Sequence, residues 1–224
     1  MLLRSVAHDL RSPLTALSGA GNLLSDRYDQ LTDGERRKLA SDVSEEIVWL
    51  SDLVENILNM TRISESQLLL KKDAEVIDDV VSEAVKHTER LFRGRRFAVS
   101  LPDEVVTASM DGKLISQVII NLLENAVRHT PPESEISLAV SAGNSLLTFA
   151  ISDTGSGVPK NIRGRLFERF VTQNDEIVDG KRGLGLGLAI CKTIVEAHGG
   201  TIAYRDNEPH GSIFTFTLPM EEQE

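Results

Sequence analysis

The stretch Gln117–Thr130, Q-V-I-I-N-L-L-E-N-A-V-R-H-T, decides the fold of the larger part of this chain. Its apolar residues recur at helical spacing, and Asn121 and Asn125 lie four residues apart, so they share a helix face that Arg128 and His129 extend. Two aligned asparagines are unusual, because asparagine is a poor helix former. They either make structural hydrogen bonds or supply oxygen ligands to Mg²⁺, with Arg128 offering charge to nucleotide phosphates.

Short strand-like segments and further helical stretches surround this helix in the sequence. The mixture predicts an α/β sandwich domain. The expected strands are Phe97–Leu101, Glu135–Val140, Leu146–Ser152, Thr201–Tyr204 and Ser212–Leu218, and the expected helices are Val76–Phe92, Gly112–His129 and Gly187–His198.

One glycine-rich segment follows the expected strand Leu146–Ser152 and reads D-T-G-S-G. An aspartate followed by glycine at a strand end is most often only a turn. Alternatively, Asp153 accepts hydrogen bonds from a ligand, while Gly155 and Gly157 let that ligand approach the backbone closely.

A second glycine-rich segment, G-L-G-L-G, places Gly183, Gly185 and Gly187 at the start of an expected helix. Amides exposed there, together with the helix dipole, favour an anion. The spacing is neither that of a dinucleotide-binding fingerprint nor that of a Walker-type phosphate loop. The preceding residues, about 164–185, show little periodicity and predict a long mobile loop that could act as a lid.

The N-terminal part has a different pattern. Apolar residues recur every three or four positions from Leu2 to Leu24, and Thr32-Asp-Gly-Glu has the form of a capping box that begins a second helix. The second helix carries a coiled-coil type of seam from Ala40 to Ile57. A hairpin with such narrow seams buries too little surface by itself, so we expect two copies to pair as a homodimeric four-helix bundle.

The predicted organisation is therefore α plus α/β. Residues 1–61 form the helical hairpin, residues 62–67 form a hinge where the heptad spacing is lost, and residues 68–220 form the α/β domain.

His8 lies on the first helix, opposite its apolar seam, and is expected to face solvent. A lone exposed histidine is most often an ordinary surface residue. Here Asp9 can orient or deprotonate the imidazole, and Ser12 lies one turn further on the same face. Pro13 removes a backbone hydrogen bond beside them, at a usual cost of about 3 kcal/mol. An exposed imidazole with a carboxylate neighbour can act as a nucleophile.

Composition excludes several functions. The 224 residues carry 34 acidic and 24 basic side chains, a net charge of -10 that argues against non-specific binding to nucleic acid or anionic lipid. The single Cys excludes an internal disulfide. We see neither a signal peptide nor an apolar run near the roughly 20 residues of a membrane helix, and expect a cytoplasmic fragment without direct membrane contact. Because Met1 lies under two helical turns before His8, we hypothesise that the chain is a fragment of a longer parent with a sensor and a membrane anchor.

The order and spacing of these motifs resemble the transmitter region of bacterial sensor histidine kinases, over nearly the whole chain. The hairpin resembles the dimerisation and phosphoacceptor domain, with H-D-L-R-S-P-L, beginning at His8, as its H-box. The remainder resembles the ATP-binding domain shared with gyrase, the large heat-shock chaperone ATPases and the mismatch-repair ATPases. N-L-L-E-N-A resembles the N-box, D-T-G-S-G the first glycine box, L-F-E-R-F (Leu166 to Phe170) the F-box, and G-L-G-L-G the second glycine box.

The resemblance implies a role for each matched residue. His8 would accept the γ-phosphoryl group of ATP with Asp9 as base, Asn125 would bind Mg²⁺ with support from Asn121, and Asp153 would hold the adenine amino group. The implied cofactor-binding set is Asn121, Asn125, Arg128, His129, Asp153, Gly155, Gly157, Gly183, Gly185 and Gly187.

Four positions depart from the family pattern. Arg128 stands where the family usually has lysine, and His129 where an aromatic residue is common. Thr154 replaces the more usual asparagine of the first glycine box. Ser12 replaces a threonine that the family links to dephosphorylation of the partner, so that second activity stays open.

The residue at position 121 separates the possible reactions. ATP-hydrolysing relatives have a glutamate there as the base for water, whereas this chain has Asn121, which suits transfer to a protein nucleophile. We therefore expect autophosphorylation on His8 and transfer to an aspartate of a response regulator receiver domain. The alternatives are an ATPase of the same superfamily and a catalytically silent scaffold that binds the regulator.

Overall fold

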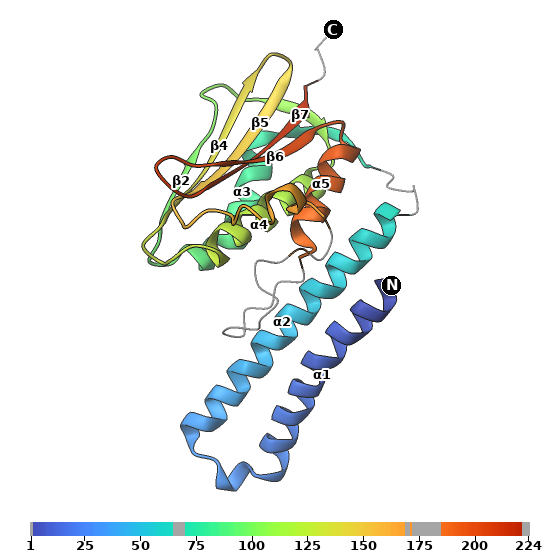
Figure 1. Cartoon of the computed structure of the whole chain (residues 1–224), viewed down its shortest axis with the longest axis vertical. Helices are drawn as coiled ribbons and strands as arrows, with labels where there is room; N and C mark the ends of the chain where they lie inside the picture. The colour runs from blue at the N-terminus through green and yellow to red at the C-terminus, as the bar shows by residue number, and fades with distance from the viewer. Residues whose placement is uncertain (1, 65–69, 169–170, 172–184, 221–224) are drawn as a thin grey trace. The chain divides into compact units, whose positions relative to one another are not determined.

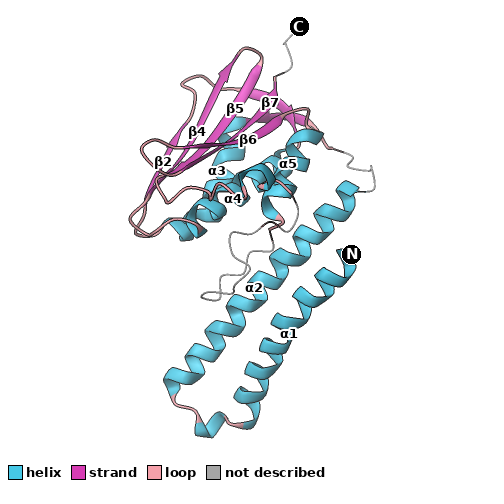
Figure 2. Ribbon diagram, viewed as in Figure 1, coloured by secondary structure: helices cyan, strands magenta, loops and turns pink. Residues whose placement is uncertain are grey.

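The computed structural model describes residues 2–64, 70–168, 171 and 185–220. The chain divides into two compact units, Met1–Thr61 and Arg62–Glu224. The first unit is helical, and the second unit combines helices with β-sheet (Figure 2). This is the α plus α/β class that the sequence predicts.

The first unit is a helical hairpin (Figure 1). Helix α1 spans Leu2–Asp26, the short 3-10 helix η1 spans Tyr28–Gln30, and α2 spans Asp33–Ser64. The boundary between the units lies where the predicted hinge at residues 62–67 begins, and α2 continues through Ser64, so residues 62–64 are helical. The hinge itself stays a prediction. Loss of the apolar spacing after residue 61 ends the seam but does not interrupt the backbone hydrogen bonds. Residues 65–67 lie outside the described part.

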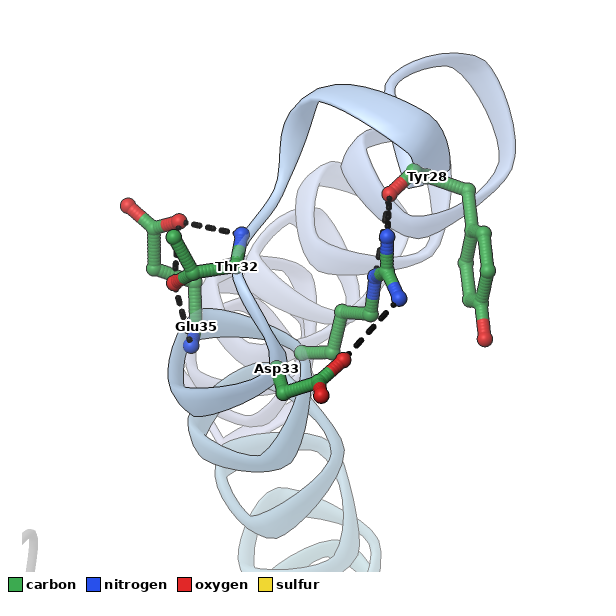
Figure 3. Close-up of polar contacts among 5 residues, drawn as sticks. Tyr28, Thr32, Asp33 and Glu35 are labelled. Carbon is green, nitrogen blue, oxygen red and sulfur yellow. Dashed lines mark hydrogen bonds and ion pairs between the residues drawn. The ribbon is translucent and has the colours of Figure 1, made fainter.

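The predicted capping box begins α2 (Figure 3). The Thr32 amide donates to Glu35 Oε2 at 2.8 Å, and the Glu35 amide donates to Thr32 Oγ1 at 3.3 Å. Arg36 then fixes the preceding loop, since its Nε and Nη2 donate to the Tyr28 carbonyl at 3.0 and 2.7 Å while its guanidinium lies 4.1 Å from the centre of the Tyr28 ring. The connection between the helices is therefore specified by local side-chain chemistry.

The second unit is built on a five-stranded sheet with strand order β2-β4-β5-β7-β6. Strands β2 and β4 pair in parallel, and the other neighbours pair in antiparallel fashion. Three helices cover one face of this sheet (Figure 1). The elements are β2 Arg96–Ser100, β4 Glu135–Gly143, β5 Leu146–Asp153, β6 Thr201–Asp206, β7 Ser212–Pro219, α3 Ile77–Thr88, α4 Gly112–Arg128 and α5 Gly187–Ala197.

The core lies between this sheet and the helices. Side chains alternate between buried and more exposed along β5, as expected for a sheet with one covered face. Phe149 of β5 stacks on its register partner Phe216 of β7 with ring centroids 4.4 Å apart. Ile115 and Leu122 of α4 are fully buried. The apolar face of α4 thus holds its polar face in a fixed orientation.

Some of this unit was not predicted. Strands β1 Asp73–Val76 and β3 Thr107–Met110 form a separate antiparallel pair. The helix expected from Val76 begins at Ile77 and ends in the 3-10 helix η2, Glu89–Phe92. The short 3-10 helix η3 spans Arg163–Arg165.

The predicted lid at about 164–185 starts too early. Leu166 is buried, and the Phe167 ring packs edge-on against Phe214 with centroids 6.4 Å apart. The first residues of the segment are therefore anchored to the sheet by aromatic and aliphatic contacts. Residues 169–170 and 172–184 lie outside the described part.

A polar junction joins the start of α4 to the end of α5. Asp111 caps α4, because its Oδ1 accepts from the Leu114 amide at 3.2 Å. Buried His198 accepts the Asp111 amide at Nε2, at 3.1 Å, and its Nδ1 lies 2.8 Å from the Ile194 carbonyl. Gly199, with φ of +83°, ends α5 in the left-handed conformation. Together these residues form the C-terminal cap of α5.

Candidate functional site

The two asparagines of α4 lie one turn apart and are half-buried. Asn121 Oδ1 accepts from Gln117 Nε2 at 3.1 Å. Its Nδ2 is buried without a hydrogen-bond partner among the described atoms, and the Cys191 thiol of α5 donates to the Val118 carbonyl of α4 at 3.8 Å. Burial raises the pKa of Cys191 to about 12, so the thiol is neutral. The Cys191 thiol therefore links α5 to α4, and Asn125 continues the polar face of α4 by one turn from Asn121.

The C-terminal end of α4 carries Arg128 and His129, both exposed. It is held by Arg95, which precedes β2. The Arg95 guanidinium donates to the carbonyls of Val127 at 3.3 Å and Thr130 at 3.2 Å. A cation at this end of a helix also complements the helix dipole. Arg95 was not predicted, because its contacts cross more than thirty positions of sequence.

Asp153 ends β5 and is 5% exposed. Its Oδ1 accepts from the amides of Gly155 at 2.8 Å and Ser212 at 3.3 Å. Burial raises the pKa of Asp153, and these amide hydrogen bonds offset only part of the rise. Because both bonds go to Oδ1, the carboxylate has a fixed orientation and a second oxygen that neither bond uses.

The residues after Asp153 form a close-packed turn. A Cβ atom on Gly155 would lie 2.6 Å from the Thr130 methyl group, so no larger side chain fits there. Gly157 has φ of +74°, a conformation that favours glycine. The Thr154 hydroxyl accepts from the Glu135 amide at 2.9 Å, so this departure from the family pattern has a structural use at the start of β4.

The second glycine motif leads into α5. Gly185 has φ of +62°, and Gly187 is the first residue of the helix, with open space around its Cα on the side where a Cβ would lie. Gly183 lies outside the described residues. Amides at this end carry the positive end of the helix dipole, as the sequence predicted.

The structure brings these three segments together. The first glycine turn contacts the end of α4 through Gly155 and Thr130, and α5 is tied to α4 through the hydrogen bond from Cys191 to the Val118 carbonyl. The buried carboxylate, the two amide side chains and the N-terminus of α5 therefore lie on segments that contact one another. Comparison with known proteins identifies the family to which a chain with these segments belongs.

Residues 110–222 match the histidine kinase-, DNA gyrase B- and HSP90-like ATPases, and residues 1–66 match the His Kinase A phospho-acceptor domain. The first match covers half of the chain. The chain belongs to the histidine kinase family. It forms the transmitter region of a sensor histidine kinase, as its motifs predicted.

Several sensor kinases are similar to this histidine kinase along nearly its whole length. The chain is 43% identical over 220 residues to the sensor protein KdpD of Clostridium acetobutylicum, covering 98% of this chain and 24% of that protein. It therefore spans about a quarter of that relative. Among solved structures, Acinetobacter baumannii AdeS superposes with a TM-score of 0.73 at 26% identity, covering 96% of this chain and 98% of that one. Full-length ShkA, solved in complex with AMPPNP, gives 0.71 at 25% identity over 98% of this chain and 45% of that one.

The predicted H-box lies in α1, which contains residues 8, 9 and 12 and has Pro13 within it. The side chains of His8, Asp9 and Ser12 lie outside the described part, so their predicted orientation and roles remain predictions. Among the helices that the structure describes, none has the length and hydropathy of a membrane span.

Sequence reasoning missed how the turn between β6 and β7 contacts the first glycine turn. In this turn, Asn207 Nδ2 donates to the Asp153 carbonyl at 2.8 Å, and His210 Nδ1 lies 3.2 Å from the Gly155 carbonyl. Turn-forming residues, N-E-P-H-G, occupy positions 207–211 and could have located the turn. Nothing in that pattern indicates which residues it contacts.

A second unpredicted cluster fixes the segment between the first glycine turn and η3. Arg163 Nε donates to the Val158 carbonyl at 2.9 Å, and Arg163 Nη1 pairs with Asp206 at 2.7 Å. Tyr204 donates to Asp206 at 2.7 Å and accepts from the Val158 amide at 3.3 Å. The backbone beyond the glycine turn is therefore tied to β6.

Proposed function

We propose that this chain binds Mg-ATP, transfers the γ-phosphoryl group to His8, and passes it to an aspartate of a response regulator receiver domain. The chain spans about a quarter of its KdpD relative, and the proposal concerns this span alone. The observation that carries the proposal is the buried carboxylate of Asp153. Oriented by two amides at one end of the site, it suits an acceptor for the amino group of adenine.

The residues present fit a magnesium nucleotide. Mg²⁺ prefers oxygen ligands and usually keeps waters and phosphate oxygens, so it needs only one or two protein oxygens. Asn125 supplies such an oxygen, with Asn121 one turn away as support, and Arg128 supplies positive charge. The structure of ShkA with AMPPNP supports nucleotide binding by this fold. Bound Mg²⁺ would offset the charge on the phosphates.

The proposed transfer uses groups from both units. An imidazole nitrogen of His8 forms a bond to the γ-phosphorus, the bond from that phosphorus to the β–γ bridging oxygen breaks, and ADP leaves. Asp9 accepts the ring proton. In the second step a regulator aspartate forms a bond to the same phosphorus as the nitrogen–phosphorus bond breaks. Such reactions depend on positioning and electrostatic stabilisation.

Exposed apolar residues on the hairpin support a homodimer. Leu14 of α1 and Ile47 and Val54 of α2 are 52, 51 and 45% exposed in the single chain. The α2 pair lies on the predicted coiled-coil seam, seven residues apart. A second hairpin packed on this seam would remove these side chains from water and complete a four-helix bundle.

The proposal is tested by incubating the chain with γ-labelled ATP and following labelled protein and free phosphate in parallel. We expect acid-labile label on the wild type and none on His8→Gln or Asn125→Ala. An ATPase would instead release phosphate steadily with or without His8, and a silent scaffold would not bind the nucleotide. Label that persists on His8→Gln would overturn the acceptor assignment.

A further inference from the structure

The turn between β6 and β7 makes several contacts with the first glycine box. Asn207 Nδ2 donates to the Asp153 main-chain carbonyl at 2.8 Å, and the Asn207 amide donates to the Gly211 carbonyl at 3.1 Å, which closes the turn. The amide of Ser212, the next residue, donates to Asp153 Oδ1. One turn therefore holds both the main chain and the side chain of Asp153.

Close packing reinforces these bonds. Gly211 has φ of +119°, and a Cβ atom there would overlap the Asp153 carbonyl oxygen and lie 2.9 Å from the Thr154 Cα. A Cβ on Gly157 would in turn lie 3.1 Å from the Gly211 carbonyl oxygen. The two turns are thus in backbone contact, and glycine is required at position 211 for both conformation and space.

His210 provides a further link to the glycine box. Its Nδ1 lies 3.2 Å from the Gly155 carbonyl oxygen, and since a carbonyl only accepts, the ring nitrogen must donate. Gly155 is also the residue whose amide donates to Asp153 Oδ1. The exposed His210 ring therefore acts on the carboxylate through one intervening residue.

We propose that Asn207 and His210 are positioning residues that set the orientation of the Asp153 carboxylate and thereby determine how strongly the site selects adenine. The inference rests on the proposed role of Asp153 as acceptor for the adenine amino group. Neither side chain needs to touch the nucleotide. A hydrogen bond weakens steeply when its acceptor rotates out of line. Selectivity for adenine therefore depends on the residues that fix the orientation of the Asp153 carboxylate.

The test compares two probes on the full chain, ATP and purine riboside triphosphate, which lacks the 6-amino group. Dissociation constants are measured by calorimetry for wild type, Asn207→Ala and His210→Ala. We expect wild type to prefer ATP by about tenfold, the worth of a hydrogen bond to a charged group. In Asn207→Ala, ATP binding weakens while analogue binding does not change, so the ratio moves toward one. His210→Ala shifts the ratio in the same direction by less.

Controls separate positioning from loss of structure. Asn144, in the turn before β5, lies at the opposite end of that strand from Asp153 and has φ of 53°, so Asn144→Gly is the matched variant expected to keep the ratio. Equal weakening of both probes, or an unchanged ratio in Asn207→Ala and His210→Ala, would overturn the positioning role. If Asn207→Ala does not fold, His210→Ala decides. A wild type that binds both probes equally would instead contradict the proposed role of Asp153 itself.

Discussion

At the scale of single residues, Asp153 combines two opposing effects. Burial raises its pKa, so keeping the carboxylate ionised at neutral pH costs folding free energy. The folded pKa lies above the ordinary value of 3.8, so stability from this group is present at low pH and is lost as the pH rises through the folded pKa. A buried carboxylate that costs folding free energy and is held in a fixed orientation is typical of a binding group rather than of a stabilising one.

Substitution of this residue should therefore separate binding from stability. We expect Asp153→Asn to weaken ATP binding by at least about tenfold, because a charged acceptor is lost. The melting temperature at neutral pH should stay the same or rise, since the amide carbonyl can still accept the two amides. Asp103→Asn, at an exposed loop position, is the matched control for the change of charge. A marked fall in melting temperature without loss of binding would refute this account of Asp153.

At the scale of single elements, the start of α2 depends on its capping box. Thr32→Ala removes the hydroxyl that accepts the Glu35 amide, and we expect the hairpin to lose about 1 kcal/mol of unfolding free energy. Urea denaturation followed by circular dichroism measures this loss. Ser44→Ala, which removes a hydroxyl that donates to the Ala40 carbonyl of the same helix, is expected to have little effect. Equal effects of the two substitutions would argue against the capping interaction.

The junction between α4 and α5 should make stability depend on pH. Burial lowers the pKa of His198, and the nearby Lys72 cation also lowers it, although the Ile194 carbonyl and Asp111 oppose this. A folded pKa below the ordinary value of 6.5 means that the stability is fully present above that pH and is lost as the pH falls toward the folded pKa. A protonated ring would also set a second donor against the Asp111 amide.

Denaturation curves at a series of pH values test this junction. We expect the unfolding free energy to fall as the pH drops below about 6.5, the ordinary histidine pKa. His198→Gln should be less stable overall and should lose this component of the pH dependence. His87→Gln, at an exposed position of α3, should retain it. An unchanged pH dependence in His198→Gln would show that other groups are responsible.

Helices and strands could be predicted from the periodicity of apolar residues wherever the element was long enough to show a period. The five strands of the main sheet and the helices α4 and α5 were predicted to within a few residues, because one covered face imposes regular alternation. Strands β1 and β3 have only four residues each, too few for a period to be recognised. Residues 62–64 of the predicted hinge are helical, because loss of the seam at Thr61 does not end a helix.

The site could be predicted only in part, for a related reason. Asp153 and Asn125 could be predicted because each belongs to a short sequence motif, D-T-G-S-G and N-L-L-E-N-A respectively. Arg95 and Asn207 act through contacts made by the fold, and no spacing rule connects them to the positions they hold. The side chain of His8 lies outside the described part, so its role remains a prediction.

At the scale of the whole molecule, the hairpin seam should set the oligomeric state. We expect the wild type to sediment as a dimer and Ile47→Lys to sediment as a monomer, because a charge on the seam cannot be buried between two hairpins. Asp42 lies about 140° around the helix from Ile47. Asp42→Lys introduces the same side chain away from the seam and should remain dimeric. A monomeric wild type, or a dimeric Ile47→Lys, would contradict the proposed bundle.

The central claim is that a nucleotide held by the α/β unit gives its γ-phosphoryl group to an imidazole of the hairpin. Mass spectrometry of the intact chain after incubation with Mg-ATP, followed by fragmentation under non-acidic conditions, tests this claim most directly. The account predicts one added phosphoryl group, located on His8. A phosphoryl group on any other residue, or ATP turnover with no modified protein, would contradict it.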